Sequence, residues 1–285
     1  RMTELQTPSA MITAAGLDWT VGLRELFLAD GRAVPSHRAI VRDDVSAVLG
    51  VASARYQPIQ NAQAAEVVDA LVTEGGAHVE VAGALGQGER CWMLAHIPAD
   101  FEVLKGDVVR PYFLLAWGHD GKHGLAGKLT PVRVVCNNTL AAAGFSGGGK
   151  WSQTAEVYIR HYGKPTLNID EARRALGIAH KQITAAADAY RALAGTELTT
   201  RQVADYFTRV FPMPADDTTP EYRERLARWT AHQSRLAELY QTGRGAALAE
   251  GTAWGAYNAA TEWVDHVYPV LQSGAVSRVR QQSVM

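Results

Sequence analysis

HVEVAGALGQGERCWMLAHI, residues 78–97, is the stretch that decides the fold class. Two apolar runs, residues 78–85 and 90–97, flank a Gly-Gln-Gly turn at residues 86–88. Apolar runs of this length on either side of a short glycine turn are typical of an antiparallel β-hairpin. We therefore expect an antiparallel sheet in the first half of the chain.

More strands are expected on the C-terminal side of this hairpin, and a helix on its N-terminal side. Asn61 is a suitable N-cap for a helix that runs to about Thr73 and presents one apolar face. Pro58 lacks a backbone N–H donor and therefore marks a bend or a strand edge before that helix. The other predicted strands cover residues 108–117, 124–130, 132–136 and 154–162.

The hydrophobic period changes after Gly163-Lys164-Pro165 from that of strands to that of helices. Helices are predicted at about residues 170–194, 199–210, 220–240 and 246–266. The order of elements predicts an α+β fold, with an antiparallel β-sheet and a packed helix in the N-terminal half and a helical C-terminal half. The predicted organisation is a flexible arm (1–20), a β-rich α+β domain (21–165), a helical domain (166–270) and a tail (271–285).

Composition bounds the class of protein. The 285 residues are 47% hydrophobic and carry a formal net charge of −1, so the chain can bury a core and lacks the basic excess of strongly electrostatic nucleic-acid binders. A local basic groove remains compatible with that charge. The lack of a long apolar stretch or signal pattern leads us to expect a cytoplasmic protein without membrane contact, and Cys91 and Cys136 are expected to be buried free thiols.

None of three catalytic patterns is complete in this sequence. His119, Asp120 and His123 offer metal ligands, but they lie in a Gly-rich turn with no further ligand nearby, which favours an exposed loop. A phosphate-binding loop fails because Trp151 follows Lys150 where a hydroxyl is needed, and no nucleophile elbow is present. The sequence predicts no catalytic residue, no metal and no cofactor, and leaves the question of enzymatic activity open.

Cationic, aromatic and amide side chains gather in and around the β-rich half. Cations can follow a phosphate backbone, and aromatic rings can stack on bases of a single strand. The alternative is that these residues form the ordinary outer faces of a sheet, with the large rings packed on the helical half. The candidate nucleic-acid-binding residues are Arg55, Tyr56, Gln60, Asn61, Lys128, Arg133, Asn137, Asn138, Lys150, Trp151, Tyr158 and Arg160.

Three segments, residues 49–61, 129–140 and 251–258, together resemble a phage- and plasmid-related family catalogued as domain of unknown function 932. The resemblance covers roughly residues 41–268 and implies a mobile-element, cytoplasmic setting without assigning an activity. The order of elements also resembles that of phage single-strand annealing proteins of the RecT, Redβ and Erf kind. Those proteins place a small sheet and helices around a groove for one DNA strand and assemble into rings or filaments.

The leading hypothesis is a non-catalytic, homo-oligomeric protein of a phage or plasmid that binds or anneals single-stranded DNA. One alternative is a metal-dependent enzyme acting on nucleic acid, with His119, Asp120 and His123 at the metal. Another is an interaction factor that binds a host protein through the helical half.

Overall fold

The computed structural model describes residues 7–130, 145, 150–161 and 169–264 of the chain. These residues divide into two compact units, which are described separately. The N-terminal unit contains the described residues of 7–100 and 110–183, and the C-terminal unit contains 101–109 and 184–264. The boundary therefore falls inside a helix rather than at the predicted residue 165, and a short hairpin from the first half belongs to the second unit.

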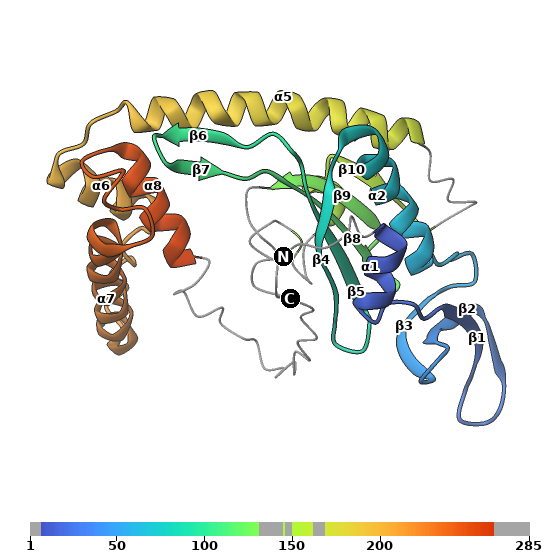
Figure 1. Ribbon diagram of the computed structural model, residues 1–285. Coiled ribbons are helices and arrows are strands. Elements are labelled where there is room, and N and C mark those ends of the chain that lie inside the picture. Colours follow the sequence, from blue (N-terminus) through green and yellow to red (C-terminus); the bar gives the residue numbers. More distant parts are fainter. Residues whose placement is uncertain (1–6, 131–144, 146–149, 162–168, 265–285) are drawn as a thin grey trace. The chain divides into compact units, whose positions relative to one another are not determined.

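A five-stranded antiparallel sheet forms the centre of the N-terminal unit (Figure 1). Its strand order is β10-β9-β8-β5-β4. These strands are β4 (His78–Leu85), β5 (Arg90–His96), β8 (Tyr112–Gly118), β9 (Leu125–Thr130) and β10 (Val157–Ile159). The predicted hairpin is thus confirmed as β4–β5, and the α+β fold class is confirmed with it.

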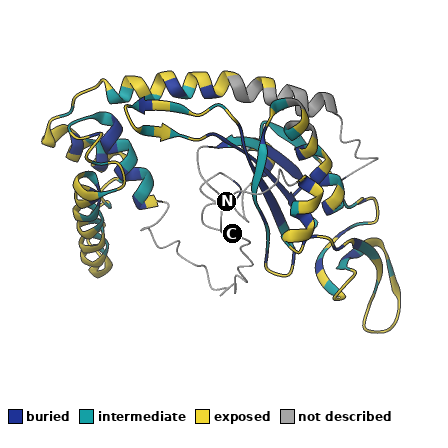
Figure 2. Ribbon diagram, viewed as in Figure 1, coloured by how far each residue is buried: buried dark blue, intermediate teal, exposed yellow. Residues whose placement is uncertain are grey.

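Both faces of this sheet are buried. Side chains alternate between the two faces along a strand, so Trp92 and Leu94 lie on one face while Met93 lies on the other. The first face packs against Phe145 and Trp151, and the other lies under α2 (Asn61–Gly75), which contacts β4, β5 and β8. Figure 2 shows the middle strands as the most buried part of the unit.

A three-stranded meander precedes α2 and was not predicted as a sheet. It consists of β1 (Val21–Phe27), β2 (Ala33–Arg42) and β3 (Ala47–Ser53), which pair antiparallel in that order. Large parts of its surface are exposed (Figure 2). Its β3 strand approaches the loop after β8 so closely that a Cβ atom on Gly50 would lie 2.5 Å from the backbone of Asp120.

The N-terminal segment is not a loose arm where the structure describes it. Residues 7–20 contain helix α1 (Pro8–Ala14), whose N-cap Thr7 accepts a hydrogen bond from the backbone N–H of Ala10. Leu17 and Trp19 follow it and are buried. The arm interpretation was wrong for these residues, because two large apolar side chains in a weakly periodic stretch still bury their surface in the core.

Two observed strands are shorter than the sequence predicted. The strand expected at 108–117 is divided before β8, because Arg110-Pro111 separates it from β7 (Asp107–Val109). The strand expected at 154–162 is shorter, since α4 (Trp151–Thr154) occupies its start and only β10 pairs. The strand expected at 132–136, including Cys136, lies outside the described residues. Cys91 is a buried free thiol as expected, and burial raises the pKa of its thiol.

The C-terminal unit is helical apart from one hairpin, β6 (Phe101–Leu104) with β7. Its helices are the end of α5 (Ile169–Ala194), α6 (Thr200–Val210), α7 (Pro220–Thr242) and α8 (Ala253–Glu262). Phe207, Leu236 and Trp263 bring α6, α7 and the end of α8 into one core. The helix predicted from residue 246 begins only at Ala253, because Thr252 acts as its N-cap.

No helix among the described residues is long and apolar enough to cross a lipid bilayer.

Candidate functional site

The aromatic rings predicted to stack on bases are inside the fold. Tyr56 is 3% exposed and Trp151 is 1% exposed. Tyr56 stacks on His161 with ring centroids 4.7 Å apart, while Trp151 packs against His123 at 4.4 Å and belongs to the core of the sheet. Base stacking by these two residues was a wrong prediction, because their faces are already covered by protein.

Tyr158 and two of the candidate amide residues, Gln60 and Asn61, also have structural partners. The Tyr158 hydroxyl accepts a hydrogen bond from the backbone N–H of Gly124. The Gln60 side chain pairs with the backbone of Val21 through its carbonyl oxygen at 3.0 Å and its NH₂ group at 2.9 Å. Asn61 is 2% exposed. These contacts join segments of the fold and leave the groups occupied.

Most of the predicted cations that the structure describes are exposed, unlike the aromatic residues. Arg55, Lys150 and Arg160 are exposed, and Lys128 is half-buried. Lys128 lies close enough to Glu156 to lower the pKa of that carboxyl group, although burial dominates and raises the pKa overall. Arg133, Asn137 and Asn138 lie outside the described residues.

Asn61 is the centre of a buried polar network at the Gly118 end of the sheet. Its NH₂ group donates to the backbone carbonyls of Leu17 at 2.9 Å and Trp19 at 3.2 Å. Its side-chain oxygen accepts from Trp117 Nε1 at 2.7 Å and lies 2.9 Å from His119 Nε2. All the hydrogen-bonding groups of this amide are used, so Asn61 ties α2 to the end of β8 and to the segment after α1.

His119, Asp120 and His123 do not form the exposed loop expected from the sequence. His119 is fully buried and His123 is 6% exposed. His119 Nε2 faces Asn61, whereas His123 Nδ1 lies 2.6 Å from Asp120 Oδ2. His119 therefore has a different partner from the Asp120–His123 pair, and the three side chains do not converge on one position for a metal ion, which removes the basis for a metal enzyme at these residues.

His161 completes this group from the end of β10. The backbone N–H of Ile59 donates to His161 Nδ1 at 3.0 Å, which makes this nitrogen the acceptor and places the ring proton on Nε2. Burial lowers the pKa of His161 to about 4, more than nearby backbone groups raise it. Burial, together with the neighbouring His161, lowers the pKa of His119 to about 3.

Asp120 is charged beside these neutral rings. Burial raises the pKa of its carboxyl group, but hydrogen bonds from the His123 ring and from the backbone N–H groups of Lys122 and His123 outweigh burial and lower it. The network thus contains two buried neutral histidines and one charged carboxylate, Asp120, that accepts hydrogen bonds from protein donors. Its position argues for a role in fixing the turn after β8 rather than in reacting with a substrate.

The histidine group that does converge was missed in the sequence. Among the residues that the structure describes, His78, Glu80 and His96 bring three potential metal-ligand atoms within 4.8 Å of one another. The signal was present as His-x-Glu within the predicted strand 78–85 and a histidine near the end of 90–97. Only the strand register places them together.

Comparison with known proteins gives a family but no activity. Neither the curated proteins nor the solved structures contain a match to this chain. One family model, described as Domain of unknown function (DUF932), matches residues 48–285. That match covers most of the sequence, from β3 of the N-terminal unit to the end of the chain, and the chain therefore belongs to the DUF932 family.

Proposed function

We propose that this chain is a non-catalytic protein of a phage or plasmid that binds single-stranded DNA through contacts with phosphates. A cytoplasmic setting and assembly into homo-oligomers are parts of the same proposal. The observation that carries it is that Arg55, Lys150 and Arg160 are exposed beside one cluster of buried rings. Among the described residues, none of these three cations forms an ion pair.

The buried rings bring these three cations to one end of the sheet. Arg55 and Arg160 each precede one partner of the Tyr56–His161 stack, and the Gln57 N–H donates to the His161 carbonyl at 2.9 Å. Lys150 precedes Trp151, whose ring packs on His123. His123 and His161 each lie two residues from the paired positions Leu125 in β9 and Ile159 in β10.

This arrangement gives the rings a supporting role in place of direct stacking. Buried aromatic side chains hold the neighbouring backbone in place, so the points from which the exposed cations extend are fixed while the cationic side chains can still rotate. Contacts with phosphates carry no sequence information, so the expected binding is independent of sequence and sensitive to salt. Because the net charge of the chain is −1, three cations make a weak site alone, and an oligomer lengthens it along the strand.

The test is fluorescence anisotropy with a labelled single-stranded oligonucleotide, measured over a range of salt concentrations. We expect binding at low salt, and a triple variant Arg55→Ala, Lys150→Ala, Arg160→Ala with much weaker affinity. Each phosphate contact contributes about 0.7 to the slope of log affinity against log salt for single strands, so the triple variant is expected to lose about 2 from that slope.

The matched control removes three other exposed cations, Arg32, Lys105 and Arg209, and changes the net charge by the same amount. We expect this control to keep the wild-type slope. Equal losses in the two triple variants, or no binding by the wild type at low salt, would refute the proposal. A double-stranded oligonucleotide of the same length measures the preference for single strands.

A further inference from the structure

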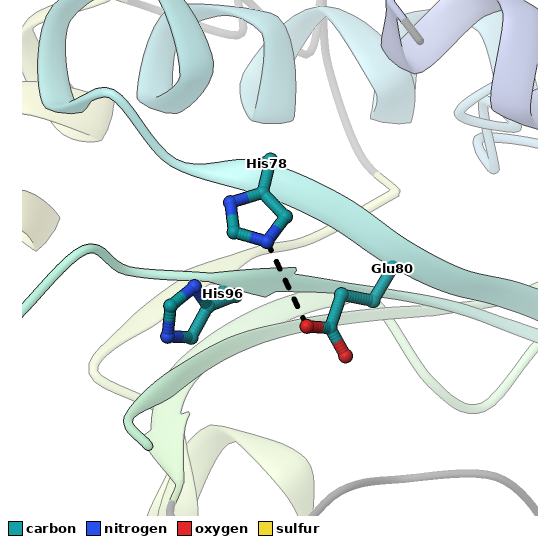
Figure 3. A group of neighbouring side chains, drawn as sticks. All are labelled: His78, Glu80 and His96. Atoms are coloured by element: carbon teal, nitrogen blue, oxygen red, sulfur yellow. Dashed lines mark ion pairs between the residues drawn. The ribbon is translucent and has the colours of Figure 1, made fainter. Parts of the chain in front are cut away.

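The start of β4 and the end of β5 bring two histidines and a glutamate together on one face of the sheet. His78 and His96 are direct cross-strand partners in the antiparallel register, and their ring centroids lie 4.7 Å apart. Glu80 follows two positions after His78, so strand alternation points it to the same face. Figure 3 shows the three side chains directed towards a common space from the two neighbouring strands.

A β-bulge makes this placement compatible with the core. The register shifts between Val79 and Val81, so β4 has one extra residue, Glu80, opposite β5. In a regular strand, His78 and Glu80 would lie on one face, and the odd-numbered Val81 and Leu85 would lie on the opposite face. Both apolar side chains instead pack with the core of the same face. Bulges that redirect a side chain are frequent beside functional sites.

The distances within this group suit shared ligation. His78 Nε2 lies 3.7 Å from Glu80 Oε1, which is longer than a hydrogen bond, and the ligand atoms of all three residues lie within 4.8 Å of one another. Two ligands of one tetrahedral Zn²⁺ ion, each about 2.0–2.1 Å from the metal, lie roughly 3.3 Å apart. Rotation of the half-buried His78 and Glu80 side chains covers the difference.

His96 is oriented as a metal-binding histidine is. Its side chain is 10% exposed, and its Nε2 lies 2.5 Å from Asp100 Oδ1. Among the described residues, its other ring nitrogen, Nδ1, is buried and has no hydrogen-bond partner. A histidine ligand commonly donates its second ring N–H to a carboxylate, which fixes the tautomer and leaves the lone pair for the metal.

The chain after β5 is folded to supply that carboxylate. The backbone N–H of Ala99 donates to the carbonyl of Ile97 at 2.7 Å, which closes a three-residue turn around Pro98. This turn directs Asp100 back to His96, four residues earlier. The second carboxylate oxygen of Asp100 lies 3.8 Å from Arg110 Nε. Asp100 is therefore a positioning residue for His96.

We propose that His78, Glu80 and His96 bind one divalent ion of the zinc class, with Nδ1 of His96 as its buried ligand atom. Two imidazoles and one carboxylate favour such an ion over Mg²⁺ or Ca²⁺, which prefer oxygen ligands. Three protein ligands leave a coordination position for water or for a ligand atom from solution. The side chains of His78 and Glu80 are 32% and 20% exposed, so the ion is reachable. The site lies at the opposite end of the sheet from the cations discussed above and is independent of them.

The test is metal binding by the full chain, without a histidine tag and after dialysis against a chelator. Zn²⁺ is titrated in competition with a chromophoric chelator, and Co²⁺ is added to a second sample to record its ligand-field absorption. We expect one Zn²⁺ per chain and a Co²⁺ spectrum typical of low coordination number. His78→Ala and Glu80→Gln are each expected to weaken Zn²⁺ binding by more than the roughly 10–100-fold loss typical of an outer-shell carboxylate.

Asp100→Asn tests the positioning role, and its expected loss of Zn²⁺ affinity is about 10–100-fold with one ion still bound at saturation. His37→Ala removes an exposed histidine of β2 and is the matched control with wild-type affinity. The proposal is overturned if the wild type binds no Zn²⁺, or if His78→Ala and Glu80→Gln keep wild-type affinity, since the ion would then lie elsewhere. Circular dichroism checks that each variant is folded. His78 and Glu80 are half-buried, so substitutions there are less disruptive to the fold than a substitution of the buried His96.

Discussion

Two groups of histidines lie at opposite ends of the same five-stranded sheet, and their surroundings differ. At the Gly118 end, His119 faces Asn61, His123 pairs with Asp120, and His161 accepts from the backbone of Ile59. At the other end, His78 and His96 face each other across two strands, and Nδ1 of His96 has no partner among the described residues.

The difference shows that closeness in sequence is a poor guide to a metal site. His119 and His123 are four residues apart, yet His119 Nε2 faces Asn61 while His123 Nδ1 faces Asp120. His78 and His96 are eighteen residues apart, yet the register brings them together. Buried His119 Nδ1 also has no hydrogen-bond partner among the described residues, so what distinguishes the candidate ligand set is the convergence of three ligand atoms on one position.

The largest expected effect concerns the Gly118 end and pH. His119 and His161 have folded-state pKa values of about 3 and about 4, below the ordinary value of 6.5. The unfolded chain therefore binds more protons below pH 6.5, and stability is lost as the pH falls from 6.5 towards 4. The expected loss between pH 8 and pH 5 is about 2 kcal/mol for each histidine.

Urea unfolding at several pH values measures this loss. His119→Gln and His161→Gln are each expected to remove about half of the combined loss of the two histidines, which is about 4 kcal/mol. His37→Gln, at an exposed histidine, keeps the wild-type pH dependence. An unchanged pH dependence in both buried variants would mean that these rings do not differ from exposed ones, and the contrast between the two ends would fail.

The second prediction concerns the amide at the centre of the network. Asn61→Ala leaves Trp117 Nε1 and two backbone carbonyls without their partner. Each buried polar group left without a partner costs about 1–3 kcal/mol, so a total destabilisation of about 3 kcal/mol or more is expected in urea unfolding. Gln57→Ala, at a nearby exposed amide, serves as the control. A loss no larger than that of the control would show that the network contributes little to stability.

The third prediction concerns the other end of the sheet. If His78, Glu80 and His96 bind Zn²⁺ in the folded state alone, Zn²⁺ at 100 times its dissociation constant adds about 2.7 kcal/mol to the free energy of unfolding. Urea unfolding with and without Zn²⁺ measures this, and Mg²⁺ at the same concentration is the control ion. Equal stabilisation of the wild type and of His78→Ala would place the effect outside this group.

The smallest effect is expected for the cations beside the buried network. Arg55→Ala and Arg160→Ala change exposed side chains, so stability is expected to change by no more than about 0.5 kcal/mol. Thermal unfolding of the single variants measures it. A larger loss would assign these arginines to the fold, and weaker DNA binding by the variants would then no longer report a binding site.

Much of the fold was predictable because local patterns carry it. The glycine turn at residues 86–88 and the apolar runs beside it predicted β4 and β5. The start of α2 was predicted to within one residue, but its N-cap is Gln60, because the Asn61 side chain is bonded to Leu17 and Trp117 instead. The meander β1–β3 was missed because its apolar runs are short and exposed, and its strands are recognisable only through pairing. The hairpin β6–β7 joins the C-terminal unit through contacts such as Trp254 Nε1 to Asp107, 147 residues apart.

The candidate site was less predictable. Arg55, Lys150 and Arg160 were correctly expected to be exposed on outer surfaces, but exposure of Tyr56 and Trp151 was wrong. An aromatic residue suits a base-stacking surface and a core equally well, and the choice depends on what covers it. For Trp151 that cover is supplied by Phe145 and His123.

The sequence by itself determined the α+β class, the central hairpin, the helical second half and the family, because turn residues, hydrophobic period and segment identity are local properties. The tertiary structure alone decided which histidines share a space and which rings are covered. Strand register and the bulge in β4 decide which side chains share a face, and the turn after β5 brings Asp100 to His96. These contacts join residues that are distant in the sequence, so no local pattern predicts them.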